Sequence, residues 1–209
     1  SLAISYVMAG KMTEAIQACK DALSFDPDYI EARMLLGRFY SNISKKDMAI
    51  EQYRKVIKVD PKKESAYILL GTIYLELDLK EKALETYEAL TSINPYSFKG
   101  NYFLGKIYFG NELYIKAAEY FKNAVEINRH SLIAQENLAQ SYLVIKDYDR
   151  AIEVYRQMFE ENQGNPQIYN RLGEIYIMKN SPEKALELFD KVREANPQNV
   201  SILLKIGSI

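Results

Sequence analysis

The stretch ESAYILLGTIYLELDLKEKALETYEALTSINPYS, residues 64–97, recurs with variations along the whole chain of 209 residues. Its marks are Leu70-Gly71, Tyr74, Ala83, Tyr87 and Pro95. The same marks stand 34 residues earlier, at Leu36-Gly37, Tyr40, Ala49, Tyr53 and Pro61, and 34 residues later, at Leu104-Gly105, Tyr108, Ala117 and Phe121. A fixed period of this size predicts an array of stacked repeats instead of one globular core.

The register runs through the chain without an insertion. Full repeats are expected at 30–63, 64–97, 98–131, 132–165 and 166–199, with partial repeats at 1–29 and 200–209. Counting each repeat from its first residue gives register positions 1 to 34. Because the sequence starts and stops inside a repeat, we expect a single repeat array that is a fragment of a longer protein.

Each repeat carries two apolar sets at helical spacing. In residues 64–97 the first set is Tyr67, Leu70 and Tyr74, the second is Ala83, Tyr87 and Leu90, and a polar link at 78–80 separates them. Steps of three and four residues predict an all-α fold in which every repeat is a helix, a tight turn and a second helix of about 13 residues each. Prolines such as Pro61 and Pro95 are expected to end second helices, and Ser181-Pro182 to open one.

Glycine stands at register position 8 of four first helices, at Gly37, Gly71, Gly105 and Gly173. A mid-helix glycine costs about 1 kcal/mol relative to alanine. Its recurrence at one position therefore predicts that a second backbone approaches there. Ala3 and Ala139 take the same position in two other repeats.

These marks resemble the tetratricopeptide (TPR) repeat, whose 34-residue period carries Leu-Gly, Tyr, Ala, an aromatic residue and Pro at fixed spacing. The resemblance covers essentially the whole chain. The chain departs from the pattern in having no tryptophan, in placing Arg129 and Gln163 where the closing proline belongs, and in placing Cys19 where the aromatic residue belongs. The resemblance implies a right-handed α-solenoid with a concave groove lined by first helices, and a scaffold that binds extended peptides or partner helices.

The positions that line the groove in the TPR family can be matched to residues of this chain by register. The residues expected to line a peptide-binding groove are Arg38, Thr72, Leu75, Lys99, Tyr102, Lys106, Phe109, Gln140, Leu143 and Asn170. Apolar groove residues are open to two interpretations, packing between repeats or an exposed interaction patch. Lys99, Tyr102 and Lys106 share one helix face, which suggests docking of a carboxylate or an acidic peptide. An ordinary pair of solvated lysines is the alternative.

One TPR subclass clamps the acidic C-termini of heat-shock chaperones with lysine, asparagine and arginine. The corresponding positions here carry Met34, Arg38, Leu69, Lys99 and Phe103, and of these only Lys99 matches. The sequence therefore argues against such a co-chaperone role.

Composition excludes several classes of function. With 27 basic and 28 acidic residues, a net charge of −1 and no basic run, no nucleic-acid partner is expected. No apolar run approaches the ~20 residues that span a bilayer, so no membrane insertion of this stretch is expected. The lone Cys19 cannot form an internal disulfide, which favours the cytoplasm without excluding the periplasm or cell envelope.

The sequence also lacks the residue patterns typical of a catalytic or metal-binding site. His130 has no histidine or cysteine near it to complete a ligand set, and no glycine-rich phosphate loop occurs. We therefore expect no catalytic residue, metal or cofactor, and a non-catalytic protein–protein interaction scaffold. Two alternatives stay open: a regulatory or substrate-recruiting arm of a larger enzyme, and a scaffold that self-associates through apolar residues near its two ends.

Overall fold

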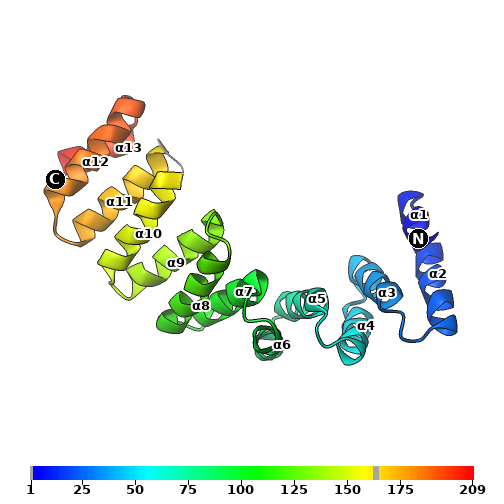
Figure 1. Cartoon of the computed structure of the whole chain (residues 1–209). Helices are drawn as coiled ribbons and strands as arrows, with labels where there is room; N and C mark the ends of the chain where they lie inside the picture. Colours follow the sequence, from blue (N-terminus) through cyan, green and yellow to red (C-terminus); the bar gives the residue numbers. More distant parts are fainter. Residues whose placement is uncertain (1, 162–164) are drawn as a thin grey trace. The chain divides into compact units, whose positions relative to one another are not determined.

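A computed structural model describes residues 2–161 and 165–209 of the chain (Figure 1). Gln163, named above as a departure from the TPR pattern, lies outside these residues. The described residues form helices and no strand. The helices are α1 (Leu2–Met8), α2 (Met12–Phe25), α3 (Ile30–Asn42), α4 (Lys46–Val59), α5 (Glu64–Glu76), α6 (Lys80–Ile93), α7 (Phe98–Gly110), α8 (Tyr114–Ile127), α9 (Leu132–Val144), α10 (Tyr148–Glu161), α11 (Pro166–Met178), α12 (Pro182–Ala195) and α13 (Val200–Gly207).

The helices belong to two compact units, Ser1–Gly100 and Asn101–Ile209. In unit 1, α2 packs against α1 and α3, and α4 packs against α3 and α5. In unit 2, α10 packs against α9 and α11, and α12 packs against α11 and α13. Each of these four second helices is thus held between the first helix of its own repeat and that of the next, which is how a solenoid of helix pairs buries faces that one pair would leave exposed.

The predicted all-α helix-turn-helix solenoid is confirmed. First helices α3, α5, α7, α9 and α11 have 13 residues, and second helices α4, α6, α8, α10 and α12 have 14. Helices α4 and α6 end one residue before Asp60-Pro61 and Asn94-Pro95, as the prolines predict. Ser181 does occupy the N-cap of α12 and Pro182 its first turn, but the Ser181 side chain makes no capping hydrogen bond.

The core of each repeat is built from the residues that recur in the sequence. The tyrosines at register position 11 of the full repeats, and those that recur on α4, α6 and α10, are all buried. Tyr6, the equivalent residue of α1, is half-buried. The alanines of the second helices, such as Ala49 and Ala83, are fully enclosed.

The glycines at register position 8 face an aromatic ring, not a second backbone as the sequence suggested. A Cβ placed on Gly71 would lie 2.5 Å from Cζ of Tyr87, and one on Gly105 would lie 2.7 Å from Cδ1 of Phe121. Gly37 and Gly173 meet Tyr53 and Phe189 in the same way. The prediction of a close approach was right, but the approaching group is the ring at register position 24 of the paired second helix.

The turn between the two helices of a repeat has one backbone geometry throughout. Register position 15 is left-handed at Ser44, Asp78, Glu112, Lys146 and Asn180, with φ between 54° and 61°, and at Gly10 with φ 74°. The next residue then donates its backbone N–H to the carbonyl of the tyrosine at position 11, as Leu79 does to Tyr74 at 2.8 Å. This pairing is the Schellman ending of an α-helix.

A cation lies over the buried tyrosine in four repeats. Lys82 lies 5.9 Å from the ring centre of Tyr74, and Arg150 lies 4.6 Å from that of Tyr142. Lys116 with Tyr108 and Lys184 with Tyr176 repeat the arrangement. Each such contact stabilises by about 0.5–1 kcal/mol at an exposed site, so the tyrosine joins its helix to the following one by charge as well as by packing.

We predict that Gly71→Ala destabilises the chain although alanine is the better helix former. The added methyl group would collide with the ring of Tyr87, which is 0% exposed and has no space to retreat. Overpacking of this kind costs about 1–3 kcal/mol, against about 1 kcal/mol gained in helix propensity. Urea denaturation should give a lower midpoint. Gly110→Ala is the control, because nothing lies within 4 Å of its added Cβ, and equal effects of the two substitutions would contradict the interpretation.

Lys146→Gly should stabilise the chain. Its φ of 61° strains an L-residue by about 1–2 kcal/mol, and glycine removes this strain at the cost of some chain entropy. A gain of about 0.5–1 kcal/mol in thermal or urea unfolding is expected. Lys122→Gly, in the interior of α8, should instead lose about 1 kcal/mol. A loss at both positions would show that the turn conformation carries no strain.

Candidate binding surfaces on the first helices

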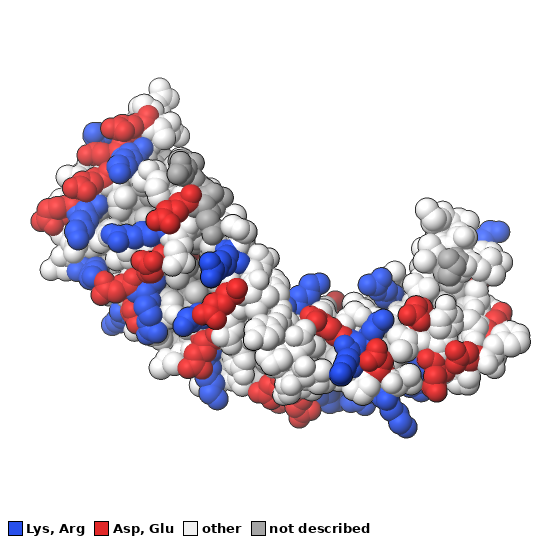
Figure 2. All heavy atoms as spheres, in the orientation of Figure 1, with Lys and Arg blue, Asp and Glu red and all other residues white. Residues whose placement is uncertain are grey.

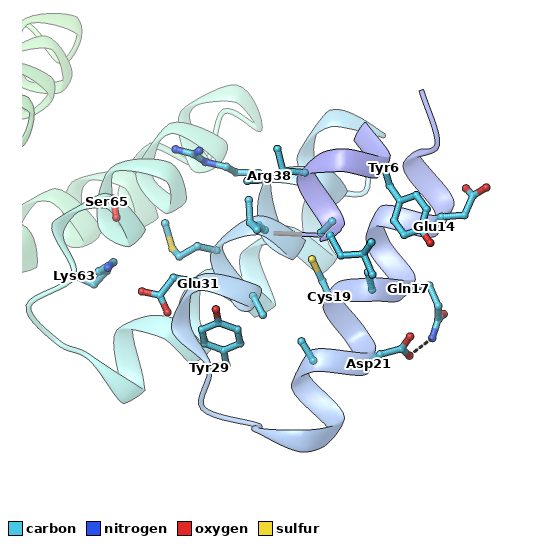
Figure 3. Close-up of a pocket in the computed structure, with 18 residues that line it drawn as sticks. Tyr6, Glu14, Gln17, Cys19, Asp21, Tyr29, Glu31, Arg38, Lys63 and Ser65 are labelled. Atoms are coloured by element: carbon cyan, nitrogen blue, oxygen red, sulfur yellow. Dashed lines mark hydrogen bonds between the residues drawn. The ribbon is translucent and has the colours of Figure 1, made fainter. Parts of the chain in front are cut away.

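A pocket of about 880 Å³ opens on unit 1 between α1, α2 and α3 (Figure 3). Its apolar wall includes Ala18 and Ala22 of α2 and Leu35 of α3. Lys63 and Ser65, at the start of α5, close it on the far side. The volume lies within the ~300–1,000 Å³ typical of ligand clefts.

Five charged groups surround this pocket. Glu14 and Asp21 stand on α2, Glu31 and Arg38 on α3, and Lys63 precedes α5 (Figure 3). Asp21 accepts a hydrogen bond from the Gln17 amide at 2.7 Å. Within the described part of the chain, none of the five forms an ion pair. Their charges are therefore available to a ligand, with acidic groups along α2 and groups of both signs on α3 and before α5.

Cys19 lies at the base of the pocket and is 2% exposed. Burial raises the pKa of its thiol, because a thiolate there would lose its hydration. The residue behaves as a small apolar side chain.

The groove residues expected in unit 1 differ in their exposure and in whether their side chains already have a partner within the chain. Arg38 and Lys99 are exposed and make no ion pair with other described residues, and Leu75 is half-buried. The Thr72 hydroxyl donates to the Ile68 carbonyl at 2.8 Å and lies 3.3 Å from the Tyr87 hydroxyl. Thr72 is thus tied to its own helix pair.

In unit 2, Lys106 and Gln140 are exposed and their side chains make no hydrogen bond with other described residues. Tyr102 is half-buried, with its ring centre 5.6 Å from that of Phe103 and 5.9 Å from that of Phe121. Tyr102 is one of the residues expected to line the groove, and these neighbours give it a packing role as well.

The remaining groove residues of unit 2 also have partners or are partly covered. The Phe109 ring packs edge-on against Tyr114 at 5.1 Å between ring centres, and Leu143 is half-buried. Asn170 accepts a hydrogen bond from the Lys205 ammonium at 2.7 Å. Whether the ten residues bind a peptide stays a prediction.

Glu174 is the centre of a charged cluster on α11 and α13. Lys205 Nζ lies 2.5 Å from its Oε1, and Arg171 lies 3.2 Å from its Oε2. Partial burial acts to raise the pKa of Glu174, but Lys205 and Arg171 together outweigh it and hold the pKa below its ordinary value of 4.5. Nearby, the Tyr155 hydroxyl donates to Glu136 at 2.8 Å, and burial followed by this carboxylate raises the pKa of Tyr155.

Some residues of the unit 1 pocket were missed by the sequence interpretation. Ala18, Ala22 and Leu35 line the pocket where the sequence, which begins at register position 6, has no residues at positions 1 to 5. The signal was present in the alignment of residues 1–29 with the full repeats. It was interpreted as a shortened repeat without considering the space beside it.

Basic and acidic side chains alternate over the face of unit 2 drawn in Figure 2, without gathering into a patch of one sign. Among the described residues, no group of three or more histidine, cysteine, aspartate or glutamate side chains is placed to hold a metal ion. No helix in the same residues is both long and apolar enough to cross a membrane.

Three family models described as tetratricopeptide repeat match the chain, at residues 30–63 and 64–97, 102–166 and 145–205. The chain belongs to the tetratricopeptide repeat family. Its position-8 glycines and position-24 aromatic residues, which face each other in the structure, and its enclosed position-20 alanines are therefore the TPR packing residues.

Solved TPR structures share this fold. YrrB, described as a TPR protein with an unusual peptide-binding site, gives a TM-score of 0.73 at 21% identity over 93% of this chain and 100% of its own. The C-terminal part of a TPR protein from Cytophaga hutchinsonii gives 0.79 at 18% identity, over 98% and 84%. MamA gives 0.68 at 24% identity, over 82% and 94%. No curated protein matches the chain significantly.

Glu174→Gln should make unit 2 less sensitive to acid. Because the folded-state pKa lies below the unfolded one, the carboxylate stabilises the fold above about pH 4.5 and loses this effect as pH falls through the folded value. Since the side chains are partly exposed, the loss at pH 7 should be about 1 kcal/mol or less. Thermal melts from pH 7 to 3 measure it. Identical pH profiles of the variant and the wild type would contradict the assignment.

Proposed function

We propose that this protein is a non-catalytic scaffold whose first helices hold a peptide or a helix of another protein. The observation that carries the proposal is the state of register position 9. Three of its five residues in the full repeats, Arg38, Lys106 and Gln140, are exposed and have no hydrogen-bond or ion-pair partner among the described residues. The other two, Thr72 and Glu174, are bonded within the chain. Second-helix charges such as Lys122 with Glu126 are instead paired along their own helix.

Exposed apolar side chains stand on two of the first helices, α9 and α11. Val144 of α9 and Ile177 and Met178 of α11 are 40%, 42% and 57% exposed. They follow the groove positions toward the C-terminal ends of the first helices. A surface that combines free polar groups with exposed apolar groups suits protein recognition, in which apolar contacts give affinity and polar ones fix orientation.

The comparison with YrrB agrees with this proposal. That protein is described as having a peptide-binding site, and it shares the fold over nearly the whole of this chain. At 21% identity the likeness concerns the fold, so the binding residues have to be argued from this chain's own surface.

Peptide display against the immobilised chain tests the proposal. Peptides selected on the wild type should bind at least ~10-fold more weakly to Lys106→Glu, because a charge reversal at a contact removes an attraction and adds a repulsion. Lys122→Glu, an equally exposed lysine on α8, is the matched control and should leave binding unchanged. Failure to select any peptide, or an equal loss with both variants, would contradict the proposal.

A further inference from the structure

A second pocket, of about 520 Å³, opens on unit 2 between the second helices α8 and α10. It lies over the first helix α9, which packs against both of them. Gln135, Leu138 and Tyr142 of α9 line it and are at most 6% exposed. All the residues that line this pocket lie between 122 and 160, so full repeats stand on both sides of it.

In other repeats, the residue at register position 4 of the first helix lies between two successive second helices. The Tyr67 hydroxyl donates to the carbonyl of Pro61, at position 32 of the preceding repeat, at 3.1 Å. The ring centre of Tyr169 lies 4.9 Å from that of Phe159, at position 28 of the preceding repeat. The same ring lies 5.5 Å from the ammonium of Lys191, at position 26 of its own repeat. Tyrosine at position 4 thus fills the space between the two second helices.

Gln135 holds position 4 in repeat 132–165 and cannot fill this space in the same way, because it is shorter than tyrosine and has no ring. The residues at positions 28 and 32 of the preceding repeat and at position 26 of its own are Val125, Arg129 and Gln157, and all three line the pocket. The Arg129 carbonyl accepts no hydrogen bond from the other described residues, whereas the equivalent carbonyl of Pro61 accepts one from Tyr67. The pocket is therefore bounded by the same register positions that surround a tyrosine elsewhere in the chain.

We propose that this pocket takes a tyrosine side chain of a partner protein. The ring lies against Leu138 and Val154, and the hydroxyl donates to the Arg129 carbonyl. The site is built on second helices and is separate from the first-helix surface of the proposed function, so the inference goes beyond that function.

The charges around the pocket favour a neutral side chain. Equal numbers of basic and acidic side chains line it, namely Lys122, Arg129 and Arg150 with Glu126, Glu153 and Glu160. A charged group would lose its hydration there and meet charges of both signs. The Arg150 guanidinium already lies 4.6 Å from the ring centre of Tyr142, so an arginine of the partner would be repelled.

Among neutral side chains, the Arg129 carbonyl distinguishes tyrosine from phenylalanine. Phenylalanine would cover this carbonyl without bonding it, and a covered acceptor without a donor is costly. Tyrosine combines an apolar ring with a hydroxyl that needs a partner when it is buried. The Tyr67 hydroxyl meets the same requirement at Pro61 within this chain.

A capped pentapeptide with one tyrosine between glycines provides the probe. It is titrated into the isotope-labelled full chain and followed by NMR. The amide signals of Leu138 and Val154 should shift and saturate. The same peptide with phenylalanine in place of tyrosine should bind at least ~3-fold more weakly, because it has no hydroxyl to donate to the Arg129 carbonyl.

Protein variants then locate the site. Gln135→Tyr should fill the pocket with the chain's own ring and abolish binding. Tyr67→Gln should open the equivalent space between α4 and α6 and add saturable shifts there. Gln167→Tyr, at an exposed glutamine of α11 outside this pocket, is the matched control and should leave the titration unchanged.

A further variant keeps the test valid if Gln135→Tyr does not fold. Val125 is half-buried on the α8 wall of the pocket. Val125→Glu places a carboxylate on this wall and should weaken the tyrosine peptide at least ~5-fold, because the bound ring would desolvate the charge. Circular dichroism has to show unchanged helix content in each variant.

Several results would overturn the inference. They are the absence of saturable shifts at Leu138 and Val154, equal binding of the two peptides, and binding that survives both Gln135→Tyr and Val125→Glu. Free tyrosine that binds at least ~10-fold more tightly than the capped peptide would replace the partner protein with a small molecule. Peptides selected on the first helices should bind Gln135→Tyr as they bind the wild type, so failure of this inference leaves the proposed function standing.

Discussion

The structure depends on one contact, an aromatic ring of the second helix resting on the bare backbone of the first. At Gly71 and Gly105 the absent Cβ leaves the space that Tyr87 and Phe121 fill. This brings the two helices of a repeat together at a fixed separation and rotation. The contact recurs in four of the five full repeats, and Ala139 takes the glycine position in the fifth. Helix pairs of the same geometry therefore stack by one local rule.

Much of this could be predicted from the sequence because the information is local and repeated. Helix lengths and the burial of Tyr74 and Tyr142 follow from spacing that every repeat restates, and the turn, expected at positions 15 to 17, lies one residue earlier at 14 to 16. The partner of the glycine could not be predicted in the same way. A small residue at a fixed position signals a close approach, but both a backbone and a ring produce that signal. The left-handed residue of the turn gave no signal either, because Glu112 and Lys146 adopt it without glycine.

The candidate site could be predicted less well, for a physical reason. Register says which side of a helix a residue occupies, but not whether neighbours already use its side chain. Arg38 and Lys106 are free as expected, whereas Tyr102 rests against two phenylalanine rings and Asn170 is held by Lys205. Such contacts depend on the identity of residues one repeat away. The pocket beside α2 lies where the sequence, which begins at register position 6, has no residues to cover that helix.

The turn between paired helices has a consequence for how such a molecule can change over generations. Serine, aspartate, glutamate, lysine and asparagine all occupy the left-handed position within this one chain, and the helix ending is the same at each. The backbone geometry is imposed by the two helices and not by the side chain. The surface formed by these turn residues can therefore acquire new charges and new contacts by single substitutions, while the helix packing beneath it is preserved.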